Sequence, residues 1–394
     1  MNIVILTKSP FPDGNAASTY VLNCCRVMTA CGHHVMVIGC RRGLETTYPA
    51  IGTFEGIEYI NFETQKHAKP LVYLFDKVWY RYAQYHLTRL KNTDIAFLFG
   101  GTKTIAKKIY SYCKKHSIKY GAFNCEWYAP DSFDKNTDAS IIKDMVDLIP
   151  FNAEHADVAI QISTLLTHYF EEHHVKTIML PNMVDLKDHK WDCRIENAGT
   201  SKLKLAYAGV PGVGKDELGV VIEAMCLLPE PCRSRTELHI WGLDTVGVEA
   251  YMGEKSDLLR DLAGCVVCHG RANQEDVPRL INECHYTVLI RTPSLRTNAG
   301  FSTKMVESFA AGVPVMANLT GDIGEYLKDG INGIIVQDDS VQACEVAIER
   351  AFTMLDKNPS MRVHARKTAE DVFEYHNFIN QTDAFFKKIS GGES

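Results

Sequence analysis

The sequence lacks the signals of a membrane-spanning or exported chain. No run of about 18 apolar residues occurs among its 394 residues, so no membrane-spanning helix is expected. The first ten residues, MNIVILTKSP, have no charged segment ahead of their short apolar run. We therefore expect this segment to form a buried strand rather than a secretion signal, and we expect a cytoplasmic protein.

The motifs of several large enzyme classes are also missing. No two aspartates stand two positions apart, which removes the D-x-D carboxylate pair of one large class of metal-dependent enzymes. G-x-S-x-G and H-E-x-x-H are absent, so acyl transfer and zinc-dependent hydrolysis have no support. Cys265 and Cys268 form a C-x-x-C without the second pair of a zinc site, and we interpret them as buried apolar residues. We expect no metal and no cofactor.

Cysteine is nevertheless present, in a number and arrangement that excludes a disulfide framework. The 13 cysteines are odd in number and scattered along a long chain, which favours reduced thiols. Hydrophobic residues make up 46% and charged residues 23%, an ordinary globular balance. A chain of 394 residues suits two domains of ordinary size.

Positive charge is concentrated in one stretch. Residues 66–120 hold twelve Lys and Arg against two Asp, a local charge of 12 − 2 = +10 in a chain of net charge −6. The stretch overlaps Leu71–Leu87, which carries aromatic residues at helical spacing. One interpretation is a core helix followed by solvated lysines. The other is a surface that touches anionic lipid or a lipid-linked substrate, with the protein peripheral on the inner face of a membrane. No nucleic-acid partner is expected.

Two series of alternating strands and helices predict two doubly wound α/β domains of Rossmann-like type. The polar residues 185–202 separate the series and are the expected linker. In the first series we expect strands at 2–7, 34–40, 57–62, 94–100, 119–124 and 157–163, with helices at 17–29, 71–87 and 103–116. In the second we expect strands at 203–209, 237–242, 265–270, 286–291, 313–317 and 332–337, with helices at 217–228 and 275–284. Ligands of such folds bind at the carboxyl ends of the strands, and two facing domains leave a cleft between them.

The segment Asn298–Val315, NAGFSTKMVESFAAGVPV, carries the strongest functional signal. A Gly-Phe-Ser-Thr turn stands where a helix is expected to begin, Glu307 follows on that helix, and Gly312 ends it. Backbone N–H groups at a helix N-terminus form an anion site. A carboxylate on the same helix can reach the hydroxyls of a sugar or nucleoside, so the segment predicts a nucleotide or nucleotide-sugar pocket.

Two further loops are candidates for a ligand site. The loop between the first strand and the first helix contains Gly14 and Asn15, and it is either part of a ligand cleft or a plain turn. Gly209 through Lys215 fits G-x-x-x-x-G-K, but Asp216 stands where a P-loop needs Ser or Thr and would repel phosphate. A P-loop nucleotidase is therefore disfavoured. Lys215 either neutralises a diphosphate or is an ordinary exposed lysine.

With these segments in order, the chain resembles glycosyltransferases of the GT-B fold, and is similar to the large family 4 (group 1). The resemblance covers most of the chain and is strongest over 203–337, where LAYAG with a downstream Lys-Asp, ELHIWG, HGR, AGFSTKMVESFAAGVPV and GDIGEYLKDGINGIIV follow in family order. It implies two Rossmann-like domains that face each other across a cleft, an acceptor-side domain at 1–184 and a donor-binding domain at 203–370. It also implies that a final helix within 371–394, expected at 371–389, packs back on the first domain.

The resemblance assigns roles to the residues already singled out. Glu307 would hold the ribose hydroxyls, and backbone N–H groups around Ser302 and Thr303 would hold the diphosphate, with Lys215 countering its charge. Lys304 or Arg296 would add a second positive group. The base would lie near Ile240–Gly242 and His269–Arg271. The implied donor site also includes Gly14, Asn15, Gly209, His269, Gly270, Arg271, Gly300 and Phe301.

The segment FNCEWYAPDSF (123–133) resembles a Glu-Trp-Tyr stretch of polysaccharide-building members of the family. It would place Glu126 at the cleft face of the first domain, where it orients the acceptor or steadies positive charge on the sugar. The alternative is a surface acid beside a buried Trp127.

Two positions depart from the family pattern. The family often has a glutamate directly before the Gly-Phe pair, linked to the sugar hydroxyls, and here that position is Ala299, with Asn298 as the neighbouring polar residue. The family also often has an arginine after the glycine that ends the 203–209 strand, and here Val210 and Pro211 stand in that place. Lys215, Arg296 or Lys304 would then carry more of the charge.

The implied activity is transfer of a sugar from a nucleotide-sugar donor to a hydroxyl of a carbohydrate or lipid-linked saccharide, with retention at the anomeric carbon and without a metal. Cell-surface polysaccharide or glycoconjugate synthesis is the expected context. Two alternatives stay open: a non-catalytic partner subunit of the same fold that binds a nucleotide sugar, and a nucleotide-sugar epimerase.

Overall fold

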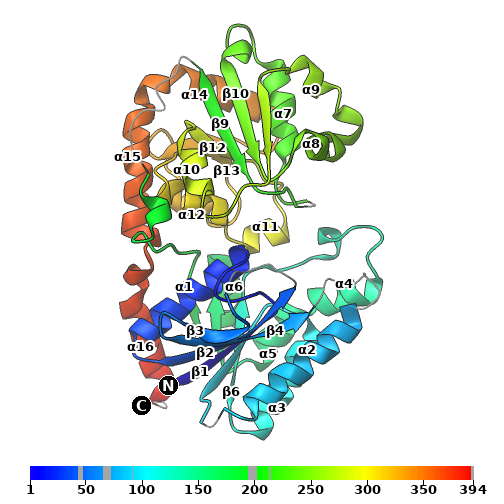
Figure 1. The fold of residues 1–394 in the computed structure, drawn as a ribbon, viewed down its shortest axis with the longest axis vertical. Helices are drawn as coiled ribbons and strands as arrows, with labels where there is room; N and C mark the ends of the chain where they lie inside the picture. Colours follow the sequence, from blue (N-terminus) through cyan, green and yellow to red (C-terminus); the bar gives the residue numbers. More distant parts are fainter. Residues whose placement is uncertain (43–47, 65–71, 91, 194–201, 213, 392–394) are drawn as a thin grey trace. The chain divides into compact units, whose positions relative to one another are not determined.

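The computed structural model describes residues 1–42, 48–64, 72–90, 92–193, 202–212 and 214–391. Parts of two predicted segments, namely 66–71 and 91 of the basic stretch and 194–201 of the linker, lie outside these residues. The chain forms two compact units: unit 1 contains Met1–Met183 and Tyr375–Ser394, and unit 2 contains Val184–Glu374. Both are α/β units built around a mainly parallel sheet (Figure 1).

Unit 1 contains an eight-stranded sheet in the order β3-β4-β2-β1-β5-β6-β7-β8. Neighbouring strands are parallel, apart from β3, which pairs antiparallel with β4. The strands are β1 Asn2–Thr7, β2 His34–Arg42, β3 Ile51–Phe54, β4 Ile57–Thr64, β5 Ile95–Phe99, β6 Lys119–Asn124, β7 Val158–Gln161 and β8 Lys176–Met179. The first strand is buried from Ile3 onward, as a central parallel strand must be, because helices cover both faces of such a sheet.

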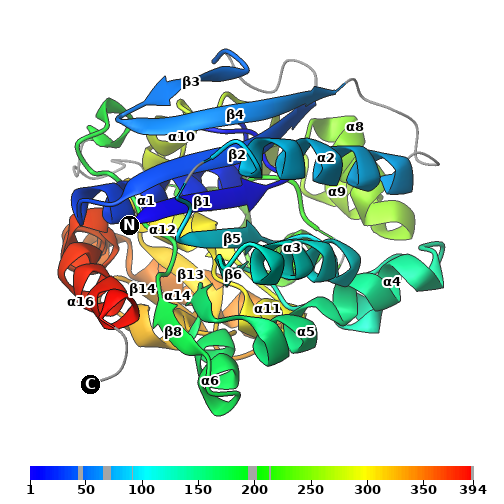
Figure 2. The same ribbon diagram turned by 90° about the horizontal axis from the view of Figure 1, so that it is seen from below.

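The helices of unit 1 follow the strands in the expected alternation. They are α1 Ala16–Ala30, α2 Val72–Leu87, α3 Lys103–Lys115, α4 Ala139–Val146, α5 Leu148–His155, α6 Thr164–Glu172 and α16 Ile379–Ser390, with short 3₁₀ turns at Pro130–Ser132 and Tyr375–Phe378. In Figure 2, α2 and α3 lie next to each other, and α16 lies beside α1 in both views.

Unit 2 contains a six-stranded, all-parallel sheet in the order β11-β10-β9-β12-β13-β14. Its strands are β9 Leu203–Ala208, β10 Thr236–Trp241, β11 Val266–Gly270, β12 Tyr286–Leu289, β13 Val315–Asn318 and β14 Gly333–Val336. Its α-helices are α7 Leu218–Leu227, α8 Thr245–Met252, α9 Leu258–Asp261, α10 Val277–Asn282, α11 Leu295–Ala299, α12 Thr303–Ala310, α13 Ile323–Tyr326, α14 Val341–Thr353 and α15 Asn358–Thr368. Short 3₁₀ turns lie at His189–Trp191, Arg233–Arg235, Gly253–Lys255 and Leu355–Lys357.

This strand order is that of a doubly wound fold, and it locates the ligand edge of unit 2. The sheet is built outward in both directions from β9, so the winding reverses between β9 and β12. In such sheets ligands bind outside the carboxyl ends of the strands at this reversal. The core beneath it is apolar and includes Leu205, Ile222, Leu238 and Val288.

The C-terminal helix predicted over 371–389 is not continuous. Ala369–Phe373 forms a π-helical turn at the end of α15, Glu374 has extended backbone, and the regular helix α16 begins only at Ile379. Val184 donates its N–H to the Phe373 carbonyl at 2.9 Å, and the Glu374 carboxylate accepts from the N–H of Leu186 at 2.7 Å. These bonds tie residues up to Glu374 to unit 2, and the next residue begins the part of the chain that belongs to unit 1.

Candidate functional site

Three glycines line the carboxyl edge of the unit 2 sheet. Gly209, Gly242 and Gly270 follow or end β9, β10 and β11, and all three have positive φ, at 135°, 113° and 71°. Gly209 donates its N–H to Trp241 at 2.7 Å, and Gly242 donates to Gly270 at 2.8 Å. A Cβ on Gly242 would lie 2.3 Å from the Gly209 carbonyl oxygen. At Gly242 glycine is required because the two chain ends approach too closely for a side chain, whereas at Gly209 and Gly270 the positive φ is what favours glycine.

The helix predicted after the Gly-Phe-Ser-Thr turn is α12. Ser302 is its N-cap, and the hydroxyl accepts the N–H of Met305 at 3.3 Å. The turn before it is rigid, since Phe301 is only 8% exposed and packs against Tyr326 and Phe373. Gly300 caps the separate short helix α11. The first turn of α12, beginning at Thr303, therefore presents backbone N–H groups and the positive end of a helix dipole from a fixed frame.

Glu307 lies one turn into α12 and is half-buried. No hydrogen bond or ion pair joins its carboxylate to another described residue. The pKa of Glu307 is raised, because the effect of burial exceeds the opposite effect of the positive charges of Lys190 and Lys304. A half-buried carboxylate without a protein partner is suited to accept hydrogen bonds from a hydroxyl-bearing ligand.

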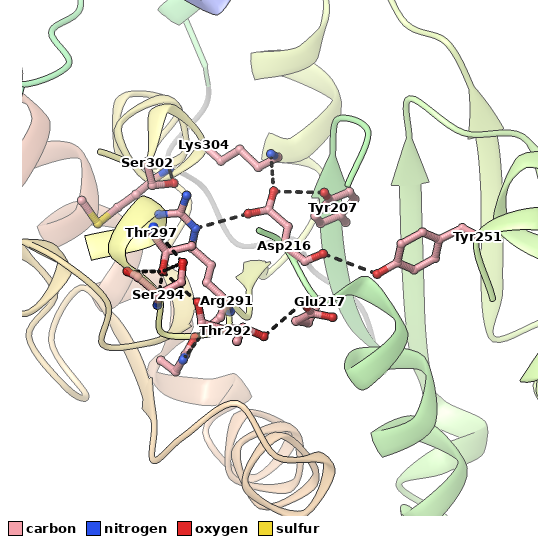
Figure 3. Close-up of polar contacts among 12 residues, drawn as sticks. Tyr207, Asp216, Glu217, Tyr251, Arg291, Thr292, Ser294, Thr297, Ser302 and Lys304 are labelled. Atoms are coloured by element: carbon pink, nitrogen blue, oxygen red, sulfur yellow. Dashed lines mark hydrogen bonds and ion pairs between the residues drawn. The ribbon is translucent and has the colours of Figure 1, made fainter. Parts of the chain in front are cut away.

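A buried charge cluster centres on Asp216, between β9 and β12 (Figure 3). The Asp216 carboxylate is 4% exposed and accepts a hydrogen bond from the Lys304 ammonium at 2.7 Å and from the Tyr207 hydroxyl at 3.1 Å. The Arg291 Nε lies 3.3 Å from its other oxygen, with the Arg291 side chain 2% exposed. The sequence analysis used Asp216 only as an argument against a P-loop; the structure adds that two cations contact its carboxylate.

The charges of the cluster shift the pKa values of Asp216 and Tyr207. Burial alone would raise the pKa of Asp216, but Lys304, Arg291 and Lys215 outweigh it and the pKa is lowered. Burial, together with the charge of Asp216, raises the pKa of Tyr207. Asp216 is therefore an anion and Tyr207 a neutral donor at physiological pH.

The backbone around the cluster is held from several sides. The Asn318 side chain accepts the N–H of Arg291 and donates to its carbonyl, both at 2.8 Å. Glu217 donates its N–H to Ile290 at 2.8 Å, and its carboxylate accepts from the Thr292 hydroxyl at 3.1 Å. The ends of β12 and β13 and the start of α7 thus form one preorganised edge (Figure 3).

A stack of three rings covers the outer part of the same sheet. His239, Trp241 and His269 are nearly parallel, with Trp241 and His269 at 4.6 Å between centroids and 7° between planes. The His239 Nδ1 lies 3.0 Å from the His269 Nε2. Burial lowers the pKa of both histidines, which favours their neutral form. Trp241 is buried, and His269 is the exposed ring of the stack. Arg271 follows it and is exposed.

The remaining predicted donor residues take varied places. Lys215 is half-buried beside Asp216, and Arg296 is half-buried on α11. Ala299 is fully buried, so a carboxylate there would need a different local packing. The Asn298 side-chain oxygen accepts the N–H of Gly321 at 2.9 Å, which commits one end of that amide to the protein.

The unit 1 candidates lie at the carboxyl ends of two of its strands. Gly14 has φ of 127°, and Asn15 caps α1 by accepting the N–H of Ser18 at 3.0 Å, so a turn and cap account for both. Glu126 follows β6 and accepts a hydrogen bond from the Tyr128 hydroxyl. Trp127 is half-buried rather than buried, and stacks obliquely on Tyr169 with ring centroids 4.4 Å apart.

The described residues contain no cluster of three or more His, Cys, Asp or Glu side chains that could hold a metal ion. Cys265 and Cys268 are both half-buried thiols, and burial raises the pKa of each. Within the described part of the chain, no helix is long and apolar enough to cross a membrane.

Comparison with known proteins agrees with this geometry. The sequence model described as Glycosyl transferases group 1 matches residues 203–354, which include the glycine edge, Asp216 and Glu307. The resemblance is to group 1 glycosyltransferases. The chain has the GT-B fold of these enzymes. Curated protein sequences contain no significant match to this chain.

Three solved glycosyltransferase structures illustrate the shared fold. HepE of Anabaena, solved in complex with UDP, superposes with a TM-score of 0.69 at 16% identity, covering 100% of both chains. Sucrose-phosphate synthase of Thermosynechococcus elongatus gives 0.72 at 13% identity, again over 100% of both. WaaG, a glycosyltransferase involved in lipopolysaccharide biosynthesis, gives 0.67 at 16% identity over 99% of this chain and 100% of its own.

Sequence reasoning missed the centre of the site. It named Lys215 and Lys304 but not Arg291, Tyr207 or the role of Asp216, because these partners are far apart in sequence. One signal was available: an arginine directly after the apolar strand YTVLI is unusual for a buried position, and a nearby acid is needed to balance it.

Proposed function

We propose that the protein is a glycosyltransferase that moves a sugar from a nucleotide-sugar donor to a hydroxyl acceptor, with retention and without a metal ion or cofactor. The observation that carries the proposal is the carboxyl edge of unit 2. There a glycine row, the first turn of α12, the Lys304 ammonium and the Glu307 carboxylate meet at one sheet edge, in the segment that resembles group 1 glycosyltransferases. The Glu307 carboxylate has no hydrogen-bond or ion-pair partner among the residues that the structure describes.

Each part of the donor has a suited group at this edge. The diphosphate would bind the first-turn N–H groups of α12 around Ser302 and Thr303, with Lys304 and Lys215 balancing its charge. Glu307 would accept the ribose hydroxyls. The base would lie near the outer strands β10 and β11. There Gly242 and Gly270 have no side chains to block the backbone, and the exposed His269 ring offers an aromatic surface. HepE binds UDP and UDP-glucose, so uridine donors are the first to test.

The leaving diphosphate would be stabilised by fixed positive charge. The helix dipole and the lysines are already oriented before the bond between sugar and diphosphate breaks. They therefore stabilise the transition state without having to reorient. Removing one such donor from a dry site typically costs about 3 kcal/mol of transition-state stabilisation. That charge would do for the diphosphate what a divalent cation does in metal-dependent transferases.

Glu126 of unit 1 is proposed to act on the acceptor side. Its carboxylate, which accepts a hydrogen bond from the Tyr128 hydroxyl, would orient an acceptor hydroxyl or steady positive charge on the sugar. Replacing Glu126 by Gln is expected to lower turnover while the dissociation constant of the donor stays within about twofold, because the donor contacts proposed above are all in unit 2.

We further propose a peripheral association with anionic membrane, which suits a lipid-linked acceptor and a role in cell-surface polysaccharide or glycoconjugate synthesis. A groove of about 520 Å³ lies between α2 and α3 and is lined by Lys107, Lys108, Lys115 and His116, with Tyr80, Gln84, Thr104, Ser111 and Tyr112. On the same helix, Lys103 and Lys114 pair with Asp147 and Asp157. No described carboxylate pairs with the three lysines of the groove.

Vesicle co-sedimentation tests this association with a matched pair of variants. Lys107→Ala/Lys115→Ala and Lys103→Ala/Lys114→Ala change the formal charge equally, but only the first pair removes lysines that line the groove. The first is expected to lose binding to anionic phosphatidylglycerol vesicles more strongly, and salt should weaken binding of the parent. Equal losses, or no preference over phosphatidylcholine, would contradict the groove as the docking surface.

Donor hydrolysis separates the transferase from its two alternatives. A transferase slowly releases nucleoside diphosphate from the right nucleotide sugar when no acceptor is present, and Glu307→Ala should abolish the release. A non-catalytic partner subunit of the same fold would bind a nucleotide sugar and release nothing. An epimerase would change the sugar without releasing nucleotide. Either of the last two outcomes would replace the proposed function.

A further inference from the structure

We infer that Asp216 is a positioning residue: it holds the Lys304 ammonium against Gly209, where Lys304 binds the donor diphosphate in place of the arginine that related transferases often carry after this glycine. The inference rests on the proposed donor site and names the group that completes it. A positively charged side chain is missing after Gly209, because that position is Val210, an apolar residue that is 64% exposed.

Lys304 occupies the space beside the glycine. A Cβ built on Gly209 would lie 2.9 Å from the Lys304 Cε and 3.3 Å from its Nζ. The ammonium therefore lies at the end of β9, one residue from the position where the arginine is missing. The fit is mutual: Gly209 has φ of 135° and no side chain, and both properties leave room for the lysine.

Exposure distinguishes the two cations that contact Asp216. The Arg291 side chain is 2% exposed, whereas the Lys304 side chain is 24% exposed. Arg291 is thus enclosed by protein, and its guanidinium is not open to a ligand. An ammonium has three N–H donors, and Lys304 directs one to Asp216 at 2.7 Å, so it keeps donors for a ligand on its open side.

The charge balance of the cluster also favours an anionic ligand. The three groups Asp216, Arg291 and Lys304 together carry a net charge of +1, and Glu307, which would hold the ribose, also interacts with Lys304. Asp216 fixes where that charge lies, because Tyr207 holds the same carboxylate oxygen at 3.1 Å and the Tyr207 ring lies 5.3 Å from the Lys304 Nζ (Figure 3). A flexible lysine is thereby ordered before the donor arrives, which lowers the entropic cost of binding.

The main test measures binding of UDP, GDP and ADP and of the matching monophosphates by calorimetric titration. Lys304→Ala leaves Arg291 paired with Asp216, so no buried charge is orphaned and the variant should fold. We expect its affinity for the preferred diphosphate to fall by about tenfold to a hundredfold, as for a lost charge-assisted bond, with a smaller change for the monophosphate. Lys255→Ala removes another ion-paired lysine of unit 2, which bonds Glu223 at 2.6 Å, and should bind as the parent does.

Rescue tests the substitution of one residue for the other. Val210→Arg restores a guanidinium after the glycine, and it should recover most of the diphosphate affinity in the Lys304→Ala background. Asp216→Asn is combined with Arg291→Met so that no buried cation is left unpaired. This double variant should lose diphosphate affinity although Lys304 is present, and Val210→Arg should again recover it.

The outcomes separate this inference from the proposed function. If the parent binds no nucleoside diphosphate, the donor site itself is wrong. If the parent binds but Lys304→Ala binds as tightly, the donor site stands and the inference fails. Equal losses for diphosphate and monophosphate in Lys304→Ala would likewise overturn it, since they would indicate general damage to the pocket.

Discussion

Asp216 stays ionised while buried because Lys304 and Arg291 both contact it. Asp216→Asn removes the carboxylate that contacts the buried guanidinium of Arg291, and we expect it to lower the free energy of unfolding by about 3–5 kcal/mol at pH 7. The lowered pKa of Asp216 means that its contribution is present above the pKa of the unfolded chain and is lost as pH falls through the folded pKa. Urea unfolding at pH 7 and at acidic pH measures this, and equal stability of the two proteins at pH 7 would refute it.

Glu307 has the opposite balance, because burial raises its pKa and no described side chain bonds it. A carboxyl group whose pKa is raised by folding does not destabilise the folded state below its pKa in the unfolded chain. Above its pKa in the folded chain, it lowers the free energy of unfolding by the full amount. We therefore expect Glu307→Gln to be more stable than the parent at pH 7, to lose this advantage in acid, and to bind the donor more weakly. Thermal unfolding across pH, paired with nucleotide titration, checks both parts. A Gln variant that is less stable at pH 7 and binds normally would show Glu307 to be structural.

At the scale of the element, the glycine row holds the ends of β9, β10 and β11 together. Gly242→Ala would place a Cβ 2.3 Å from the Gly209 carbonyl oxygen. Gly264 is the matched control, since its φ is also positive, at 82°, and a Cβ there meets nothing within 4 Å. We expect about 1 kcal/mol for Gly264→Ala from backbone strain alone, and more than twice that for Gly242→Ala. If denaturant unfolding gives similar losses of stability for Gly242→Ala and Gly264→Ala, the backbone at this edge can move to accommodate a side chain, and the prediction is wrong.

The elements themselves could largely be predicted, because each rests on a local pattern. The apolar runs at 2–7, 119–124 and 203–209 became β1, β6 and β9, with bounds that differ by at most one residue. The edge strand β3 was not foreseen, since a half-exposed strand has no buried run to mark it. The helix at 371–389 was expected as one unbroken helix, and the local sequence does not show where hydrogen bonds from Val184 and Leu186 interrupt it.

The sequence predicted only those parts of the site whose residues lie close together in one segment of the chain. The α12 turn and Glu307 lie in a single stretch, and the glycines mark their own positions. The contact between Asp216 and Lys304 joins residues 88 positions apart, and sequence spacing cannot show which cation reaches a given acid. The sequence analysis therefore considered Asp216 only against the P-loop pattern, whereas its cationic partners are Arg291, which follows β12, and Lys304 on α12.

At the scale of the whole molecule, the chain's last helix belongs to unit 1. Phe386 on α16 is fully buried and meets His33 edge-on at 4.7 Å, and the Cys31 thiol contacts the Ile379 carbonyl. We expect Phe386→Ala to lower the stability of unit 1 by about 3–5 kcal/mol. The neighbouring Phe385 is half-buried, and Phe385→Ala should cost clearly less. Hydrogen exchange localises the effect; equal costs, or an effect confined to unit 2, would contradict the assignment.

The central claim is that unit 2 holds a nucleotide-sugar donor at the carboxyl edge of its sheet. The most direct measurement is thermal unfolding of the parent and of Glu307→Ala with a panel of uridine, guanosine and adenosine diphosphates and their sugars. A ligand that binds only the folded state at 100 times its dissociation constant stabilises by about 2.7 kcal/mol. We expect one nucleotide class to raise the unfolding temperature of the parent and to have little effect on Glu307→Ala. If no nucleotide raises it, or if both proteins respond equally, the donor site is not where this structure puts it.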